Sequence, residues 1–79
     1  MDAGQIQNAI LRYFQEAEPS VEVGTDLNAA GLLDSLATLQ ANAFIERTFG
    51  VKVPDSELNL VNFHTIESIA ILVLKYVGR

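Results

Sequence analysis

Apolar residues recur at helical spacing in three stretches of the chain, over residues 3–17, 34–49 and 65–77. Positions i, i+3, i+4 and i+7 share one face of a helix, so each stretch predicts a helix with one side against a core. The first stripe consists of Ile6, Ala9, Ile10, Tyr13, Phe14 and Ala17. The last stripe consists of Ile66, Ile69, Ala70, Val73, Leu74 and Val77. Ile71 and Leu72 add apolar surface on other sides, so this last helix is expected to be the most buried.

Turn and cap residues predict where these helices begin and end. Pro19 and Ser20 stop the first helix after about residue 17. Asp34 is a favoured N-cap for the second helix, which runs to Phe49. Gly50 then suits the position after the helix end, and Thr65 can cap the last helix.

The segments between the helices differ in length. Residues 18–33 form a loop longer than most connections, and its scattered apolar residues are expected to pin it onto the helices. These residues are Val21, Val23, Leu27, Leu32 and Leu33. Pro54 predicts a turn that opens a short third helix over about 55–61. We therefore expect an all-α four-helix bundle, with three longer helices, one short third helix and a long loop between helices one and two, in a single domain over residues 1–79.

The second helix has two apolar sides with different roles. Its core-facing side is predicted to consist of Ala37, Ala41, Phe44, Ile45 and Thr48. A narrower stripe, displaced from that side, consists of Leu36, Gln40, Ala43 and Arg47. We interpret this stripe as a partner-binding surface. For Leu36 a place in the core is the alternative, and for Arg47 a solvated charge is the alternative.

The charge balance limits the partners. The chain has ten acidic and five basic residues and a net charge of −5, which repels nucleic acid and anionic lipid headgroups. The longest apolar run, Ile69 to Leu74, has six residues, whereas a membrane span needs about 20. The N-terminal residues also lack a secretory signal pattern. We expect no nucleic-acid binding, no membrane insertion and a cytoplasmic localisation.

The candidate chemistry is sparse. Without cysteine and with His64 as its one histidine, the chain offers no thiolate or multi-histidine metal site. Ser35 and His64 alone lack the orienting acid and oxyanion site of a hydrolase, so no catalytic residue is expected. His64 is interpreted as a loop histidine near the last helix.

Ser35 is the candidate functional residue. It lies in the first turn of the second helix, where backbone N–H groups lack intrahelical partners and the helix dipole is positive. Such a position favours an attached phosphate group. Asp34 fixes the helix start, and Gly31 allows a sharp turn before it. The alternative is an ordinary first-turn serine.

Asp34-Ser35-Leu36 resembles the Asp-Ser-Leu signature of acyl carrier proteins. Residues 25–27, 49–55 and 62–69 resemble other segments of that family, so the likeness covers nearly the whole chain. It implies that a phosphopantetheinyl transferase attaches 4′-phosphopantetheine from coenzyme A to Ser35. The arm would then hold cargo as a thioester on a protein that is not itself an enzyme.

The subtype follows from further residues. The run from Gly31 to Leu36 resembles D-alanyl carrier proteins and related aminoacyl carriers, and Glu46 is the one acidic residue of the second helix after Asp34. This likeness implies a free-standing, monomeric carrier that is loaded by an adenylating ligase and serves downstream acyl-transfer enzymes. Aminoacyl cargo is favoured over fatty acyl cargo. The alternative from another class is an unmodified acidic adaptor that binds a partner through Leu36 and Ala43.

Overall fold

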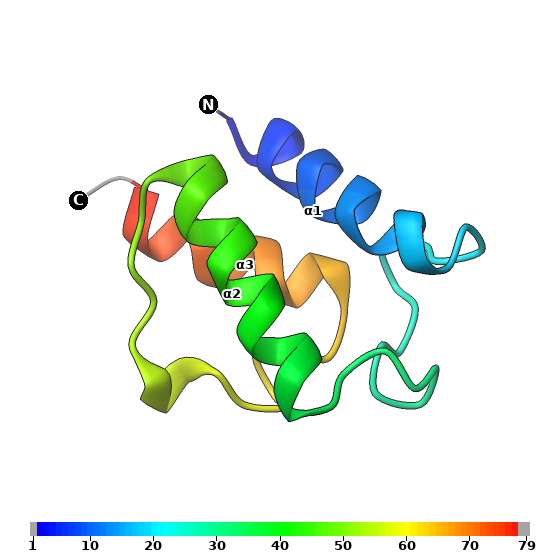
Figure 1. Ribbon diagram of the computed structural model, residues 1–79. Helices are drawn as coiled ribbons and strands as arrows, with labels where there is room; N and C mark the ends of the chain where they lie inside the picture. Colours follow the sequence, from blue (N-terminus) through cyan, green and yellow to red (C-terminus); the bar gives the residue numbers. More distant parts are fainter. Residues whose placement is uncertain (1, 78–79) are drawn as a thin grey trace.

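The computed structural model describes residues 2–77, and all regular structure in that range is helical (Figure 1). The helices are α1 (Ala3–Ala17), α2 (Ser35–Phe49), the short 3-10 helix η1 (Asp55–Glu57) and α3 (Ile66–Val77). No strand occurs among residues 2–77. The all-α fold class is confirmed.

Side-chain and glycine caps determine the ends of α1 and α2. Asp2 and Gln5 form a capping box: Gln5 N donates to Asp2 Oδ1 (2.8 Å) and Asp2 N donates to Gln5 Oε1 (2.9 Å). Asp34 begins α2, and Gly50 ends it in the left-handed region (φ 69°), which glycine adopts without strain. The predicted ranges of these two helices are confirmed.

The short helix expected over 55–61 is not formed at that length. Only Asp55–Glu57 is helical, as η1, and turns follow it. Two asparagines explain the early end, because their side chains bind backbone groups that a longer helix would need. Asn59 Oδ1 accepts from Asn62 N (3.0 Å), and Asn62 Nδ2 donates to Glu57 O (3.0 Å). The described range therefore has three α-helices, and a four-helix bundle is not confirmed.

The core is built mainly by α1 and α3, which pack against each other. The buried residues of α1 are Ile6, Ile10 and Phe14. Those of α3 are Ile66, Ile69, Ala70, Leu72 and Val73. α2 adds only Ala41 and Ile45. Val53 and Phe63 contribute from the segment between α2 and α3, and Val21 and Leu27 from the loop between α1 and α2.

Some residues predicted to be in the stripes lie outside the core. Ala17, Thr48 and Leu74 are exposed. Ala37 and Phe44 are partly buried, so the core side of α2 is narrower than predicted. Ile71 is exposed, although α3 is the most buried helix, as expected.

The long loop is pinned as predicted. Val21 and Leu27 are buried, and the other three apolar residues of the loop are partly buried. Leu27 N donates to His64 O (2.9 Å), and Glu67 N donates to Val23 O (3.2 Å). The loop is thus tied to the start of α3 before it leads into α2.

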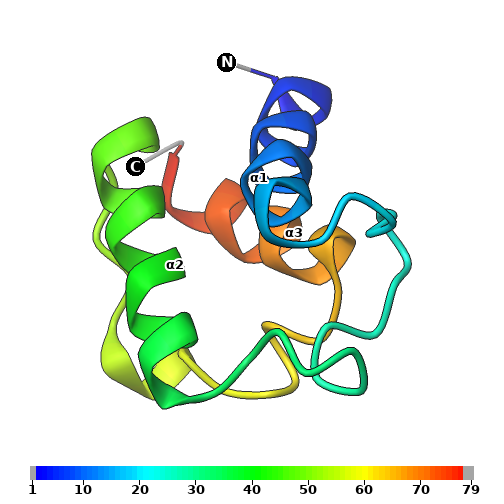
Figure 2. The same ribbon diagram turned by 45° about the vertical axis from the view of Figure 1, so that its right-hand side comes forward.

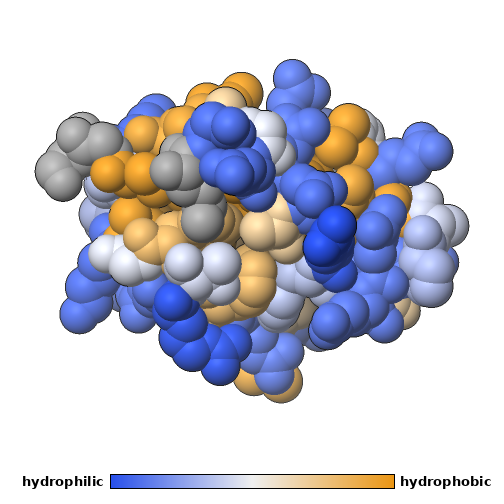
Figure 3. Space-filling model, turned by 90° about the horizontal axis from the view of Figure 1, so that it is seen from above, coloured by the Kyte–Doolittle hydropathy of each residue, from blue (hydrophilic) through white to orange (hydrophobic). Residues whose placement is uncertain are grey.

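The first turn of α1 and the last turn of α3 lie at one end of the molecule, and α2 begins at the opposite end (Figures 1 and 2). Seen from the first of these ends, hydrophobic atoms reach the surface in several separate patches, with hydrophilic atoms between them (Figure 3). Within residues 2–77, no helix has the length and apolar character needed to cross a membrane.

Candidate functional site

Ser35 is the first residue of α2 and is exposed. Asp34 precedes it as the N-cap residue, and its Oδ1 accepts from the Ala37 backbone N–H (2.7 Å). The Asp34 carbonyl oxygen accepts from both Thr38 N (3.0 Å) and Thr38 Oγ1 (2.9 Å). The helix start is therefore fixed by its neighbours, and none of the hydrogen bonds within residues 2–77 engages the Ser35 side chain.

The backbone around Ser35 has unused donors. Within the described part of the chain, neither the Ser35 N–H nor the Leu36 N–H has a hydrogen-bond acceptor. Both groups lie at the positive end of the α2 dipole. A phosphate bound to Ser35 Oγ would find donors and favourable charge there, so this helix start fits a phosphate-linked group.

The loop before α2 holds the helix start in place. Gly31 has a φ of 75°, and Leu32 N donates to Leu27 O (3.0 Å) across the turn. Asp26 Oδ1 accepts from Ala29 N (2.9 Å), and Asp26 Oδ2 lies 3.1 Å from His64 Nε2. Two hydrogen bonds lower the pKa of the Asp26 carboxylate. The larger effect comes from the backbone N–H of Ala29 and the smaller from the His64 side chain. His64 thus links the two loops, in keeping with its interpretation as a loop histidine near the last helix.

An open groove of about 680 Å³ adjoins Ser35. One wall is the start of α2, where Ser35, Thr38 and Leu39 line it. The other wall is the segment after Pro54, with Asp55, Leu58, Asn59, Leu60 and Phe63. Asn28, Leu33 and Asp34 also line the groove. The groove therefore offers an apolar surface beside the serine, and its charged lining groups are carboxylates.

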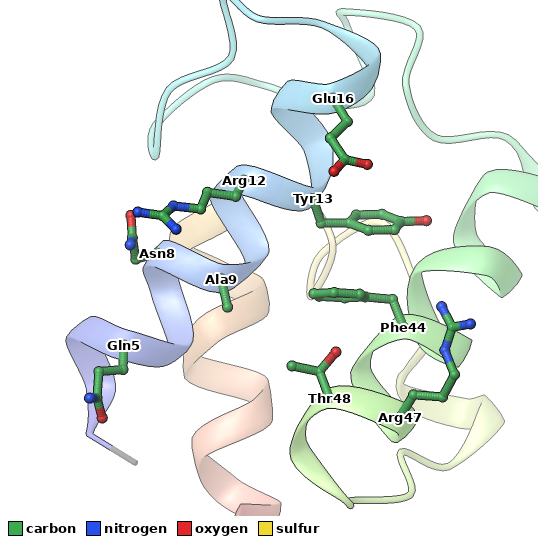
Figure 4. A pocket seen from close by; sticks show the side chains of 9 residues that line it. All are labelled: Gln5, Asn8, Ala9, Arg12, Tyr13, Glu16, Phe44, Arg47 and Thr48. Carbon is green, nitrogen blue, oxygen red and sulfur yellow. The ribbon is translucent and has the colours of Figure 1, made fainter.

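The four residues of the predicted partner-binding stripe are all exposed, and they are spread along the length of α2. Leu36 follows Ser35 directly. Arg47 lies twelve residues after Ser35, about 18 Å along the helix. It lines a different groove, of about 590 Å³, between α1 and α2 (Figure 4). Tyr13 and Phe44 stack there with ring centroids 4.4 Å apart. Gln40 and Ala43 lie between the two ends of this stripe.

Sequence reasoning missed the far wall of the serine groove. Leu39 lies one turn after Ser35, so helical spacing could have placed it there. Leu60 gives no such signal, because the sequence pattern places it at the end of the expected short helix. Its position beside the start of α2 depends on the path of the chain from η1 to α3, which no local pattern contains.

The charged residues of the described range do not form a candidate metal site beside the serine site. Within residues 2–77, no group of three or more His, Cys, Asp or Glu side chains could hold a metal ion.

Comparisons with known proteins agree with the serine site. The family model for the phosphopantetheine attachment site matches residues 4–73. The chain belongs to this family.

Curated relatives indicate the subtype. The chain is similar to D-alanyl carrier proteins of Streptococcus pyogenes, including those of serotype M5 (strain Manfredo), serotype M49 (strain NZ131) and serotype M1. It is 40% identical to each over 58 residues, which is 73% of this chain and 72% of the relative. The resemblance to carriers of the D-alanyl and aminoacyl type is thus confirmed.

Family membership also decides the cofactor and the class of protein. The cofactor is 4′-phosphopantetheine, bound covalently, and the start of α2 fits its phosphate. The chain is a carrier protein and not an enzyme, as expected for this family.

Proposed function

We propose that this protein is a single-domain carrier that holds an aminoacyl group as a thioester on a phosphopantetheine arm at Ser35. The observation that carries the proposal is an exposed serine at the first turn of α2, beside two backbone N–H groups that have no acceptor within residues 2–77. The match of the phosphopantetheine attachment family, which spans this serine, supports it. When bound, the arm supplies the thiol that the chain itself lacks.

The residues around Ser35 have separate tasks in this proposal. The transferase would take the proton from Ser35 Oγ, which forms a phosphodiester as the pyrophosphate bond of coenzyme A breaks and adenosine 3′,5′-bisphosphate leaves. The N–H groups of Ser35 and Leu36 stabilise the phosphate charge. Asp34 keeps the helix start in place through its bond to Ala37 N. It acts as a cap and needs no contact with the cargo.

The subtype and the partners belong to the same proposal. Similarity to D-alanyl carrier proteins supports aminoacyl cargo over fatty acyl cargo. The partners are a phosphopantetheinyl transferase, an adenylating ligase that activates the cargo with ATP, and downstream acyl-transfer enzymes. Leu36, Gln40, Ala43 and Arg47 are exposed and available for these contacts. We place this work in the cytoplasm, where coenzyme A and ATP are available, and expect a monomer that visits one enzyme at a time.

Intact-mass measurement tests the attachment site. The purified protein is incubated with coenzyme A and a broad-specificity phosphopantetheinyl transferase. The wild type should gain the mass of one arm, and Ser35→Ala should gain none. Ser56→Ala is the matched control, since Ser56 is another exposed serine at a helical turn, and it should gain the arm like the wild type. No gain by the wild type, or a gain by Ser35→Ala, would refute the site.

A loading assay tests the cargo. The modified protein is incubated with ATP and an adenylating ligase of each kind, one that activates D-alanine and one that activates a fatty acid. Mass gain with the amino acid and little with the fatty acid is expected. Stable loading by the fatty acid alone would overturn the aminoacyl assignment while leaving the attachment site intact.

A further inference from the structure

The groove between α1 and α2 has a charge opposite to that of the serine groove. Arg12 lines it from α1 and Arg47 from α2, and among residues 2–77 Glu16 is the one acidic residue in its lining. In the same range, the serine groove is lined by the carboxylates of Asp34 and Asp55 and by no basic residue. The α1–α2 groove thus holds two of the five basic residues of a chain whose net charge is −5.

The two arginines of this groove are not used to hold the domain together. Both are exposed, and within residues 2–77 neither guanidinium has a hydrogen-bond acceptor or a carboxylate partner. The ion pair of the described range joins His64 and Asp26 instead. A guanidinium binds a carboxylate through two parallel N–H bonds, so both arginines are available to an acidic ligand from outside.

Aromatic and small side chains form the floor between the arginines. Tyr13 from α1 and Phe44 from α2 stack across the gap, with ring centroids 4.4 Å apart and an interplanar angle of 25° (Figure 4). Both rings also pack against the buried core, which holds them in place. Ala9 and Thr48 lie beside the stacked pair, and their short side chains leave the groove its volume of about 590 Å³ (Figure 4). A groove with this floor can take an apolar side chain of a bound peptide.

α2 presents its two grooves on opposite faces. Three residues near its start line the serine groove, namely Ser35, Thr38 and Leu39. Three residues nearer its end line the other groove, namely Phe44, Arg47 and Thr48. At about 100° per residue, the centres of these two sets lie roughly 180° apart around the helix. A ligand in the α1–α2 groove therefore leaves Ser35 accessible.

We propose that the α1–α2 groove is a second protein-binding site, and that its occupant is an acidic segment of a partner protein. The carboxylates of this segment pair with Arg12 and Arg47, and an apolar side chain packs on the Tyr13–Phe44 pair. The net charge of −5 repels the extended negative charge of nucleic acid and of anionic membranes, so a short acidic peptide is the anion that suits two isolated arginines. A partner held here leaves the proposed arm at Ser35 free to reach an enzyme.

Nuclear magnetic resonance with a defined peptide tests the site. The probe is a synthetic peptide of glutamate and leucine with one tryptophan, and the control peptide has lysine at every glutamate position. The acidic peptide should shift the backbone amide signals of Ala9, Phe44 and Thr48 and leave those of Ser35 and Leu39 in place. No shift at these three residues with millimolar acidic peptide, or equal binding of the lysine peptide, would overturn the inference.

Charge variants separate the groove from the overall charge of the protein. Arg12→Gln with Arg47→Gln should weaken the dissociation constant of the acidic peptide about fivefold, as expected for the loss of two exposed ion pairs. The matched control is Lys52→Gln with Lys75→Gln, which removes the same charge at two exposed residues outside the groove lining. It should change the constant less than about twofold.

Circular dichroism and thermal melting confirm that both double variants are folded. An unchanged affinity of the arginine variant would overturn the inference, and so would an equal loss in both double variants, because that loss would reflect net charge alone. The unmodified and the arm-bearing protein should bind the acidic peptide equally, within about twofold, since Ser35 lies on the opposite face of α2. Loss of peptide binding on attachment of the arm would contradict two separate sites.

Discussion

α2 and α3 have similar lengths but very different relations to the core. α3 contributes five buried residues to the core, and α2 contributes only Ala41 and Ile45. α3 is paired with α1, whereas α2 exposes apolar residues beside Ser35 at one end and stacks Phe44 on Tyr13 toward the other. α1 and α3 therefore supply most of the buried core, while α2 contributes little to it and presents the serine.

The exposed apolar residues of the two helices differ in the same way. Ile71 and Leu74 of α3 are exposed to solvent, and neither of them lines the serine groove. Leu36 and Leu39 of α2 are exposed to a similar degree, but they lie next to Ser35 and to the groove. Position beside the serine, and not exposure alone, therefore distinguishes Leu36 and Leu39 from the exposed apolar residues of α3.

The largest expected effect comes from the core of α3. Ile69 is fully buried, so Ile69→Ala should lower the free energy of unfolding by about 2–5 kcal/mol through lost burial and a cavity. A domain of this size keeps only roughly 3–5 kcal/mol, so the variant should be largely unfolded. The paired variant Leu39→Ala on α2 should cost about 0.5 kcal/mol, because Leu39 is mostly exposed. Urea denaturation measures both, and equal losses would contradict the division between scaffold and presented helix.

A smaller effect is expected at the cap of α2. Asp34→Ala removes the acceptor of the Ala37 N–H and should cost about 1 kcal/mol. Asp34→Asn is the matched control, because asparagine caps helices nearly as well. Thermal melting compares the two. If Asp34→Asn destabilised the domain as much as Asp34→Ala, the negative charge and not the cap bond would be the important feature.

The smallest effect concerns the loop that leads to α2. The hydrogen bond from Ala29 N and the contact with His64 lower the pKa of Asp26 below its ordinary value of 3.8. A lowered pKa in the folded state adds stability above the ordinary pKa, and this stability is lost as the pH falls through the lowered one. The wild type should therefore melt slightly above Asp26→Asn at neutral pH.

This difference in melting temperature should shrink below about pH 4, as Asp26 becomes protonated. Thermal melting of both proteins from neutral to acidic pH measures it. Asp2→Asn is a useful control, since that carboxylate caps α1 far from the loop. A difference that grew on acidification would show that the Asp26 pKa is not lowered by folding.

The helices were predictable from the sequence because their determinants are local. The apolar spacing and the cap residues Asp34 and Gly50 predicted α2 to the residue. The expected helix over 55–61 was wrong in length, because the side chains of Asn59 and Asn62 compete for backbone groups. Thr48 was wrongly assigned to the core, since spacing alone does not show how closely α2 approaches its neighbours.

The site was predictable only in part, because some of its determinants are local in sequence and others depend on the tertiary fold. The helix start at Ser35 and the exposure of Leu36 follow from residues within one turn of the serine. The groove depends on Leu60, which is twenty-five residues away in sequence and reaches α2 only through the fold. Arg47 shares a stripe with Leu36 on a helical wheel, but α1 makes it part of another groove.

The positions of the start of α1 and the end of α3 have a practical consequence. α1 begins and α3 ends at the side of the molecule opposite to the start of α2 (Figure 1). An affinity tag, a fluorescent reporter or a surface anchor joined at either end would therefore point away from Ser35. The domain could be immobilised or strung in tandem with its serine still open to passing enzymes.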